Sequence, residues 1–305
     1  MVADRGAPVD VALESDVERA VALQVLGSGG PMHAEGRGSA AYLLWVDQRP
    51  AVVVDMGGDT PTALARAGVR ACEVDTLLLT HFHPDHISGL PDFLWGEMVA
   101  ERNRPLTIVG PDGNEDIPDL TTMLRRLFGS RGAFAEMASL FGESGFRLQA
   151  RVVSTAQRRA HVVLRDDELR VSAFPVSHGR VPTLSYRVEA GGASIVFASD
   201  QTLRDKGFVR FARETDLLVM HAMATCEAAS DQLARVVALP GDLATTAADT
   251  KAKRVLLGHL MGNSHDAALA QKWSLTSLEA VRSTVAAAAT SGSVELAYDQ
   301  ACYPL

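Results

Sequence analysis

The chain has 305 residues, of which 47% are hydrophobic and 22% are charged, a composition that is ordinary for a globular protein with a sizeable core. Its formal net charge of −8 argues against a broad nucleic-acid surface, because phosphate binding needs clustered Lys and Arg side chains. No uninterrupted apolar run reaches the ~20 residues that a membrane-spanning helix needs, so we expect no membrane partner.

Strand and helix patterns follow one another through the first half of the chain. Residues 1–19 are polar and lack periodicity, and we interpret them as a loose N-terminal arm. A polar turn at Asp47–Pro50 separates two apolar runs, which predicts a hairpin. The expected strands are Ala20–Gly27, Ala40–Val46, Ala51–Asp55, Val74–Thr80 and Leu106–Val109, and the expected helices are Pro61–Ala67 and Gly89–Arg102.

Residues 118–142 carry apolar side chains at helical spacing. We expect two helices here, broken at Gly129–Gly132, and we interpret about 114–145 as a helical insertion near the mouth of the active site. The alternative is a segment that packs in the core or forms a lid and takes no part in chemistry.

The second half returns to strands and then alternates with helices. The expected strands are Leu148–Val153, His161–Leu164, Leu169–Pro175, Thr183–Glu189, Ser194–Ala198, Asp216–Met220, Arg254–Leu257 and Val294–Tyr298, with a last helix near Ser277–Ala289. The chain has no internal repeat, low-complexity tract or Pro/Ser-rich linker. We therefore predict a single α/β domain over 20–305, in which a pair of sheets is covered on the outside by helices.

Three cysteines occur, and no two of them have the close spacing of a zinc knuckle or a redox dithiol. We expect buried or free thiols at Cys72, Cys226 and Cys302. A disulfide between Cys226 and Cys302 is the alternative, and it would imply an oxidising compartment.

The strongest chemical signal is the run from Thr80 to His86, which reads Thr-His-Phe-His-Pro-Asp-His. Imidazole nitrogens and carboxylate oxygens are ligands that zinc prefers, and four such residues follow an apolar strand directly. We expect them on a loop that Pro84 stiffens, with His81 and His83 facing one metal and Asp85 and His86 facing a second. A chance cluster is improbable because the whole chain has nine His residues.

This motif resembles that of the metallo-β-lactamase superfamily, and the resemblance extends along most of the chain. It implies an α/β fold, the αββα sandwich of two mixed β-sheets packed face to face, and two Zn²⁺ ions per chain, with Mn²⁺ or Fe as alternatives. It also implies further roles: His178 in FPVSHG as the third ligand of the first metal, Asp200 in SIVFASD as the bridging carboxylate, His259 in VLLGHL as the last ligand of the second metal, and Asp55 in VVVDMGG as the residue that orients the metal loop.

The sequence around these residues is similar to that of the ribonuclease Z and arylsulfatase branch of the superfamily. The stretches LGSGGP, GRGSAAYLL, VSHGRVPTLSYRV and IVFASDQ carry this resemblance. Ribonuclease Z has a flexible arm that holds tRNA between the third His and the bridging Asp. Here only 22 positions separate His178 from Asp200, which leaves no room for an arm. We therefore expect a small-molecule ester substrate and no tRNA.

His221 is the most ambiguous of the histidines. Members of this branch often carry His-Glu-Ala-Thr near the end of a strand, where the His transfers a proton. In this chain Met220 takes the His position and His221 takes the Glu position. A shift of one residue along a strand points a side chain to the other face of the sheet. His221 is therefore a candidate proton donor, and a His that packs or supports a ligand is the alternative. Of the remaining histidines, His161 is expected on a strand surface, while His33 and His265 lie on polar loops that could reach the substrate.

These observations predict a dinuclear zinc-dependent hydrolase that attacks a phosphodiester or sulfate ester with a metal-bridging hydroxide. Asp85 or Asp200 would orient the nucleophile, and His221 would protonate the leaving group. A lactone, β-lactam or other carboxylic ester hydrolase is one alternative, and a non-catalytic metal-binding protein is another. The stretch LTHFHPDHISGLPDFL and the terminal DQACYPL are similar to exported bacterial members, which favours a periplasmic or exported protein whose signal has been removed, with a cytoplasmic protein as the alternative. A homodimer stays open.

Overall fold

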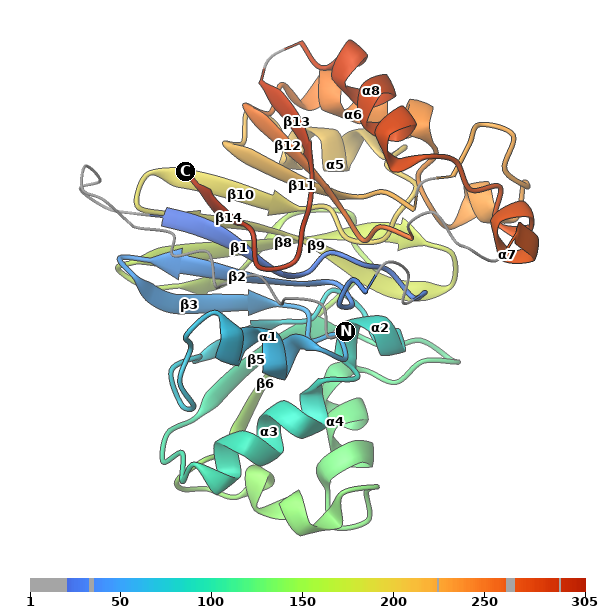
Figure 1. Cartoon of the computed structure of the whole chain (residues 1–305). Helices are drawn as coiled ribbons and strands as arrows, with labels where there is room; N and C mark the ends of the chain where they lie inside the picture. Colours follow the sequence, from blue (N-terminus) through green and yellow to red (C-terminus); the bar gives the residue numbers. More distant parts are fainter. Residues whose placement is uncertain (1–20, 33–35, 224, 262–266, 291) are drawn as a thin grey trace, which may run out of the picture.

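The computed structural model describes residues 21–32, 36–223, 225–261, 267–290 and 292–305. The predicted N-terminal arm, His33 and His265 lie outside these residues. These described residues form two β-sheets of seven strands each that pack face to face (Figure 1). The first sheet contains, in spatial order, β14 (Cys302–Pro304), β1 (Val21–Gly27), β2 (Ala41–Val46), β3 (Arg49–Val54), β4 (Thr76–Leu78), β5 (Leu106–Pro111) and β6 (Leu148–Val153). The second contains β13 (Ser293–Leu296), β12 (Arg254–Gly258), β11 (Leu217–His221), β10 (Ala193–Phe197), β9 (Val181–Ala190), β8 (Leu169–His178) and β7 (His161–Arg165).

Both sheets are mixed, as the resemblance implies. In the first sheet β1, β2 and β3 pair antiparallel, and β3, β4, β5 and β6 pair parallel. In the second sheet β7 to β10 pair antiparallel, and β10 to β13 pair parallel. Parallel strands bring their carboxyl ends to the same edge of a sheet, which is where α/β proteins place their sites.

Apolar side chains fill the space between the sheets and cover both outer faces. The inner core joins residues of the two sheets, among them Tyr42 and Leu44 of the first and Tyr186 and Phe197 of the second. A second apolar cluster lies under α5, α6 and α8, and a third lies under α1, α3 and α4. The helices are α1 (Thr60–Arg66), α2 (Pro84–Ile87), α3 (Leu90–Val99), α4 (Leu120–Phe128), the 3₁₀ helix η1 (Ala135–Phe141), α5 (Lys206–Phe211), the 3₁₀ helix η2 (Leu233–Arg235), α6 (Pro240–Thr250), α7 (Ala267–Lys272) and α8 (Leu278–Ala288).

The segment expected to hold two helices contains one α-helix, α4, and one 3₁₀ helix, η1. Asp119 caps α4 by accepting a hydrogen bond from the Thr122 backbone N–H, and Gly129 ends the helix. The buried side chains of α4 and η1 belong to the cluster on the outer face of the first sheet. The loop before α4 lies closer to the strand ends, because Asn114 Nδ2 donates to the Arg180 carbonyl at 2.7 Å.

Three local expectations need correction. The motif at 81–86 is not entirely a loop, because Pro84 starts the short helix α2, where its missing N–H is not needed. The strand β14 was not expected, since three residues with a Pro at a sheet edge give little periodic signal. The alternative disulfide is wrong, because Cys226 and Cys302 are both free.

Among the described residues, no helix is both long and apolar enough to cross a membrane. This agrees with the absence of a long apolar run in the sequence.

Candidate metal centre

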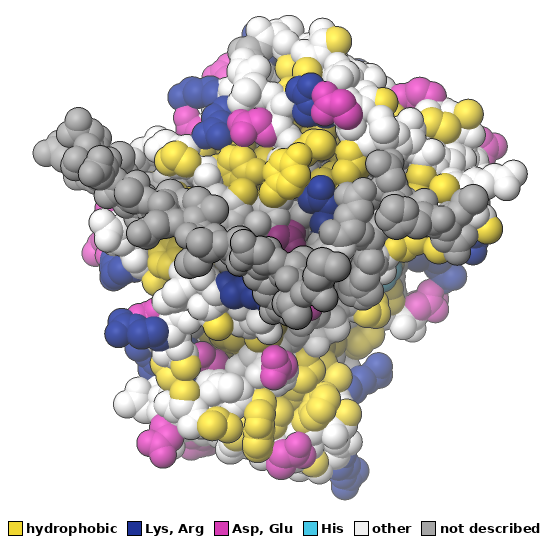
Figure 2. All heavy atoms as spheres, viewed as in Figure 1, with side chains coloured by type: hydrophobic (Ala, Val, Ile, Leu, Met, Phe, Trp, Pro, Cys, Tyr) yellow, Lys and Arg dark blue, Asp and Glu magenta, His cyan; other side chains and the backbone are white. Residues whose placement is uncertain are grey.

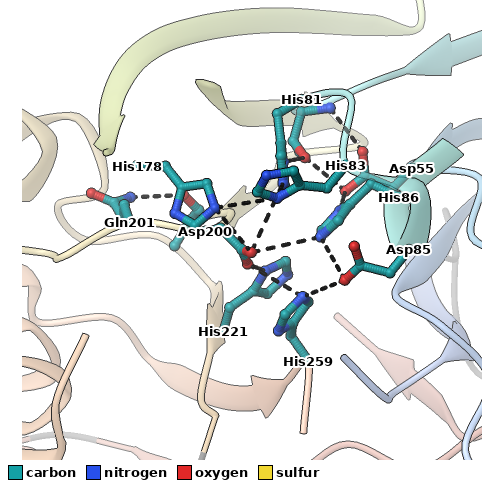
Figure 3. Close-up of polar contacts among 12 residues, drawn as sticks. Asp55, His81, His83, Asp85, His86, His178, Asp200, Gln201, His221 and His259 are labelled. Atoms are coloured by element: carbon teal, nitrogen blue, oxygen red, sulfur yellow. Dashed lines mark hydrogen bonds and ion pairs between the residues drawn. The ribbon is translucent and has the colours of Figure 1, made fainter. Parts of the chain in front are cut away.

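The predicted ligands come from two different sheets and meet at one edge of the sandwich (Figure 3). The run that follows β4 supplies His81, His83, Asp85 and His86. The second sheet supplies one residue at the end of each of three strands: His178 ends β8, Asp200 follows β10, and His259 follows β12. Asp55 and His259 both have left-handed backbone φ values, 60° and 55°, so the chain turns sharply where these strands end.

The first ligand group consists of His81, His83, His178 and Asp200, and their donor atoms face a common point. His83 Nδ1 lies 2.9 Å from His81 Nε2 and 3.4 Å from His178 Nε2. Asp200 Oδ2 lies 3.9 Å from His81 Nε2 and 3.7 Å from His178 Nε2. Four donors in a tetrahedron around zinc lie about 3.3 Å apart, given zinc–ligand bonds of about 2.0–2.1 Å. The group therefore has the size of a zinc site.

The second ligand group, as the sequence predicts it, consists of Asp85, His86, His259 and Asp200; in the structure His221 also gathers with His86, His259 and Asp200, and Asp85 lies beside them. His86 Nε2 lies 3.6 Å from Asp85 Oδ2 and 3.8 Å from Asp200 Oδ2. His259 Nε2 lies 3.2 Å from Asp85 Oδ2 and 3.5 Å from Asp200 Oδ1. These distances bracket the same tetrahedral value of about 3.3 Å. Asp200 belongs to both groups, and its Oδ2 faces His81, His86 and His178 together.

Hydrogen bonds behind the ligands decide which nitrogen of each ring is free. His86 donates from Nδ1 to Asp55 Oδ2 at 2.8 Å, and His178 donates from Nδ1 to the Val236 carbonyl at 2.7 Å. Thr80 Oγ1 gives its only proton to Asp55 Oδ2, so it accepts from His81 Nδ1 at 3.0 Å. In the neutral form of all three rings, Nε2 therefore carries the lone pair, which points at the centre.

These lone pairs supply the test of whether the residues fit a metal. His86 Nε2 is buried and has no hydrogen-bond partner among the described residues. His81 Nε2 and His178 Nε2 both face His83 Nδ1, and Asp200 brings a buried carboxylate against all of them. Buried lone pairs and a buried carboxylate facing one another are unfavourable without a cation between them. The donor set therefore fits divalent metal ions.

Burial and charge set the protonation of these groups. Burial lowers the pKa of His81 well below its ordinary value and also lowers the pKa of His83, which keeps both imidazoles in the neutral form that binds metals. Burial opposes ionisation of Asp85, but the hydrogen bond from His259 and the charge of His86 lower its pKa to about 2. For His86, burial is outweighed by the attraction and hydrogen bond of Asp55, which raise its pKa to about 9, so a metal ion that binds Nε2 must displace a proton from this ring. Burial likewise opposes ionisation of Asp200, but His259 and His221 hold its pKa well below the ordinary value.

His221 lies against the same carboxylate. Its Nδ1 is 2.6 Å from Asp200 Oδ1, and its Nε2 is 3.3 Å from the Tyr42 hydroxyl. Burial lowers the pKa of His221 to about 4, against the hydrogen bond with Asp200. Its neighbour Met220 is fully buried in the apolar cluster on the other face of the second sheet. The strand register therefore turns His221, and not Met220, toward the metal centre.

The structure brings all seven expected ligands, Asp55 and His221 together. His161 lies apart, on the edge strand β7. Sequence reasoning missed Tyr42, the supporting hydroxyl of Thr80 and the Val236 carbonyl. A Tyr within an apolar strand gives the pattern of a core residue, and a backbone carbonyl has no sequence signal at all.

A Met-rich cluster borders the centre. It consists of Met223, Leu233, Val237 and Met261, which are buried, with Met32, Val236 and Trp273 among the partly buried residues packed against them. Met223 follows His221 by two positions and Met261 follows His259 by two positions, while Val236 contacts His178 through its carbonyl. The surroundings of the metal centre on this side are therefore apolar.

Comparisons with known proteins agree with the fold. The ribonuclease Z of Mycobacterium bovis (strain BCG / Pasteur 1173P2) is 30% identical over 184 residues, which are 58% of this chain and 62% of that protein. The chain thus spans about three fifths of the length of this relative.

Two solved structures share the fold. The metallo-beta-lactamase fold protein YhfI from Bacillus subtilis matches with a TM-score of 0.71 at 16% identity, over 94% of this chain and 100% of that chain. The short form of human tRNase Z matches with a TM-score of 0.66 at 22% identity, over 92% and 98%. The family model of the metallo-beta-lactamase superfamily matches residues 34–271. The chain therefore belongs to the metallo-beta-lactamase superfamily.

Proposed function

We propose that this protein is a dinuclear zinc-dependent hydrolase that cleaves a phosphodiester or sulfate ester in a small molecule. The observation that carries the proposal is the pair of near-tetrahedral ligand groups that share the single carboxylate of Asp200. Two cations held by one shared carboxylate are the arrangement that hydrolases use to clamp both oxygens of a displacement. The ribonuclease Z relatives support a phosphodiester bond in particular.

In this proposal the first ligand group holds one ion and the second ligand group holds the other. When bound, such ions lower the pKa of water from 15.7 to about 7 and stabilise negative charge that develops on the substrate. Asp55 and Thr80 keep the rings of His86 and His81 oriented, so that their Nε2 atoms stay directed at the centre. Manganese and iron ions can also bind some of these ligand types, so the test includes an analysis of the bound metal.

Different residues would orient the attacking water, admit the substrate and contact its apolar part. The side chain of Asp85 is 12% exposed, against 7% for Asp200, so Asp85 is the carboxylate better placed to accept a hydrogen bond from an attacking water. His83 is the partly exposed member of the first ligand group, so substrate approaches from its side. The Met-rich cluster excludes water beside the centre and provides apolar contacts for a substrate group.

Three features support a small substrate over tRNA. Short turns at Gly179–Arg180 and Gly191–Gly192 connect β8, β9 and β10, so no arm is inserted between His178 and Asp200. Among the described residues on the face in Figure 2, basic and acidic side chains are interspersed and form no continuous basic patch. The net charge is −8, which disfavours binding of a long polyanion.

The test is a substrate panel on protein whose metal content has been measured. It contains bis-p-nitrophenyl phosphate, p-nitrophenyl sulfate, p-nitrophenyl acetate, a lactone and a cephalosporin. We expect about two zinc ions per chain and the highest kcat/KM on the phosphodiester or the sulfate. Fastest turnover of the acetate, lactone or cephalosporin would replace the proposed bond type. Two bound ions with no turnover of any ester would indicate a metal-binding protein without this activity.

A further inference from the structure

A buried chain of hydrogen bonds links the shared carboxylate to the opposite sheet. Asp200 Oδ1 lies 2.6 Å from His221 Nδ1 on β11, and His221 Nε2 lies 3.3 Å from the hydroxyl of Tyr42 on β2. Tyr42 is 1% exposed and belongs to the core between the sheets, where its ring lies 5.5 Å from that of Phe197. None of the residues expected to support the ligands, such as Asp55, reaches Asp200 in this way.

The proton positions in this chain follow from the partners. A carboxylate only accepts hydrogen bonds, so His221 must donate from Nδ1 to Asp200. A neutral imidazole has one N–H, so Nε2 is then an acceptor and the Tyr42 hydroxyl donates to it. Both ring nitrogens of His221 are thereby occupied, and neither is left to face a substrate.

The backbone of the neighbouring strand makes room for this arrangement. Gly258 pairs with His221 across β11 and β12, and it directly precedes the ligand His259. A Cβ atom added at Gly258 would lie 2.4 Å from the Tyr42 hydroxyl oxygen, which is closer than any real contact allows. The absence of a side chain at Gly258 is therefore what admits the Tyr42 hydroxyl beside His221.

We propose that His221 is a positioning residue that selects which oxygen of Asp200 is shared between the two ligand groups, and that Tyr42 holds His221 in the required tautomer. With Oδ1 engaged by His221, Oδ2 is turned toward His81, His86 and His178, at 3.9, 3.8 and 3.7 Å. Without that bond Asp200 is free to rotate about its terminal torsion, and the shared atom is no longer fixed. This inference rests on the proposed metal centre.

Two other roles for His221 lead to different outcomes. As a proton donor to the leaving group, it would need a ring N–H that faces the substrate, which both hydrogen bonds prevent. As a metal ligand, it would join His86, His259 and Asp200, with which it gathers in the structure, but its Nδ1 lies only 2.6 Å from Asp200 Oδ1, well under the tetrahedral spacing of about 3.3 Å. The distance is that of a charge-assisted hydrogen bond.

The experiment measures zinc affinity by competition with a chromophoric chelator in wild type, His221→Ala, His221→Asn, Tyr42→Phe and the double variant Tyr42→Phe/His221→Ala. The side-chain amide of Asn can place an N–H near the position of His Nδ1, so His221→Asn keeps the bond to Asp200. We expect His221→Ala to weaken binding of zinc about 10–100-fold, the usual effect of removing a partner behind a ligand. His221→Asn should restore most of that loss. Tyr42→Phe should cost about 2–10-fold, and no more in the His221→Ala background.

Tyr186→Phe is the matched control for Tyr42→Phe. Tyr186 is as deeply buried, and its hydroxyl donates to the Leu79 carbonyl at 2.8 Å without touching a ligand side chain. The Tyr186→Phe substitution should lower the melting temperature and leave zinc affinity at the wild-type value. Equal losses of zinc affinity in Tyr42→Phe and Tyr186→Phe would overturn the role of Tyr42.

Other results of these measurements distinguish the three possible roles of His221. If His221→Asn binds zinc as weakly as His221→Ala, His221 is a ligand and the positioning role is wrong. If both variants bind zinc normally but lose turnover of alkyl esters more than of nitrophenyl esters, His221 is a proton donor and the inference is again wrong. A wild-type protein that binds no zinc would instead contradict the metal centre itself, so the two failures are distinguishable.

Discussion

The two sheets contribute to the candidate metal centre in different ways. The first sheet supplies four ligands from one short run, 81–86, together with the supporting residue Asp55 at the end of the neighbouring strand. The second sheet supplies isolated residues, His178, Asp200 and His259, from strand ends that are far apart in sequence. The first contribution depends on a local turn, and the second depends on how β8, β10 and β12 are ordered and registered in the sheet.

The comparison predicts that the shared residue of the second sheet matters most. Asp200→Ala removes one donor from both ligand groups, while the apolar strand β10 remains intact. We expect turnover to fall by at least about 10²–10³-fold, the scale of removing one electrostatic element of an active site, and zinc to be lost from both groups. The measurements are kcat/KM on the best ester, metal content and melting temperature.

Asp216→Ala is the matched control for Asp200→Ala. Asp216 precedes β11 and accepts hydrogen bonds from the Ser194 backbone N–H and hydroxyl, at the start of β10 and away from the centre. Its loss should lower stability and leave turnover and zinc content unchanged. Near-wild-type activity of Asp200→Ala at saturating zinc would show that Asp200 is not the shared ligand.

A change in the local run of the first sheet should affect one ligand group only. Asp85→Asn removes the carboxylate that the second ligand group does not share. We expect metal content to fall from about two ions to about one, measured by elemental analysis after dialysis. The reciprocal variant His83→Ala should also retain about one ion, in the second ligand group. Loss of both ions from either variant would mean that the two groups do not fill independently.

We expect a smaller effect from a change in Asp55, which supports the ligand run 81–86 through hydrogen bonds. Asp55 accepts from the Thr80 backbone N–H, the Thr80 hydroxyl and His86 Nδ1. Asp55→Asn keeps the shape and tolerates the left-handed φ of 60°, but it weakens these bonds. We expect zinc affinity to drop about 10–100-fold with little change in the fold.

Asp112→Asn provides the control for this prediction. Asp112 accepts from the Thr155 backbone N–H and hydroxyl in the same manner, and no His among the described residues hydrogen-bonds to it. Zinc affinity should be unchanged in that variant. An equal loss of affinity in both variants would assign the effect of Asp55→Asn to general destabilisation.

The smallest expected effect concerns RNA. The tight hairpins of the second sheet leave no arm between His178 and Asp200, so we expect no useful removal of a 3′ trailer from a precursor tRNA. The measurement compares the trailer-cleavage rate with kcat/KM on the best small ester, at two salt concentrations. Trailer removal at a comparable rate, with a steep decrease at higher salt, would show a polyanion surface that the net charge of −8 does not suggest.

The ligands of the first sheet could be predicted from the sequence more directly than those of the second sheet. The run 81–86 is recognisable without a structure because four ligand-type residues stand within six positions after an apolar strand. His178 and His259 are ordinary single histidines that become candidates only through their order along the chain. Their distances to the centre follow from strand pairing, which a single sequence does not encode locally.

The contacts of His221 and Tyr42 could not be predicted from the sequence. Whether His221 or Met220 faces the centre depends on strand register, because neighbouring side chains point to opposite faces. The contact between Tyr42 and His221 joins strands of different sheets that lie 179 positions apart, and it further depends on a missing Cβ at Gly258.

The sequence by itself determined the ligand-bearing run, the order of the remaining ligands and the pattern of strands and helices, because these are written in residue type and short-range periodicity. Only the tertiary structure decided which ring nitrogens are free, which oxygen of Asp200 faces both ligand groups, and that a Tyr of the opposite sheet lies behind Asp200. These depend on the packing of two sheets, which brings donors and acceptors within 3–4 Å although the chain separates them widely.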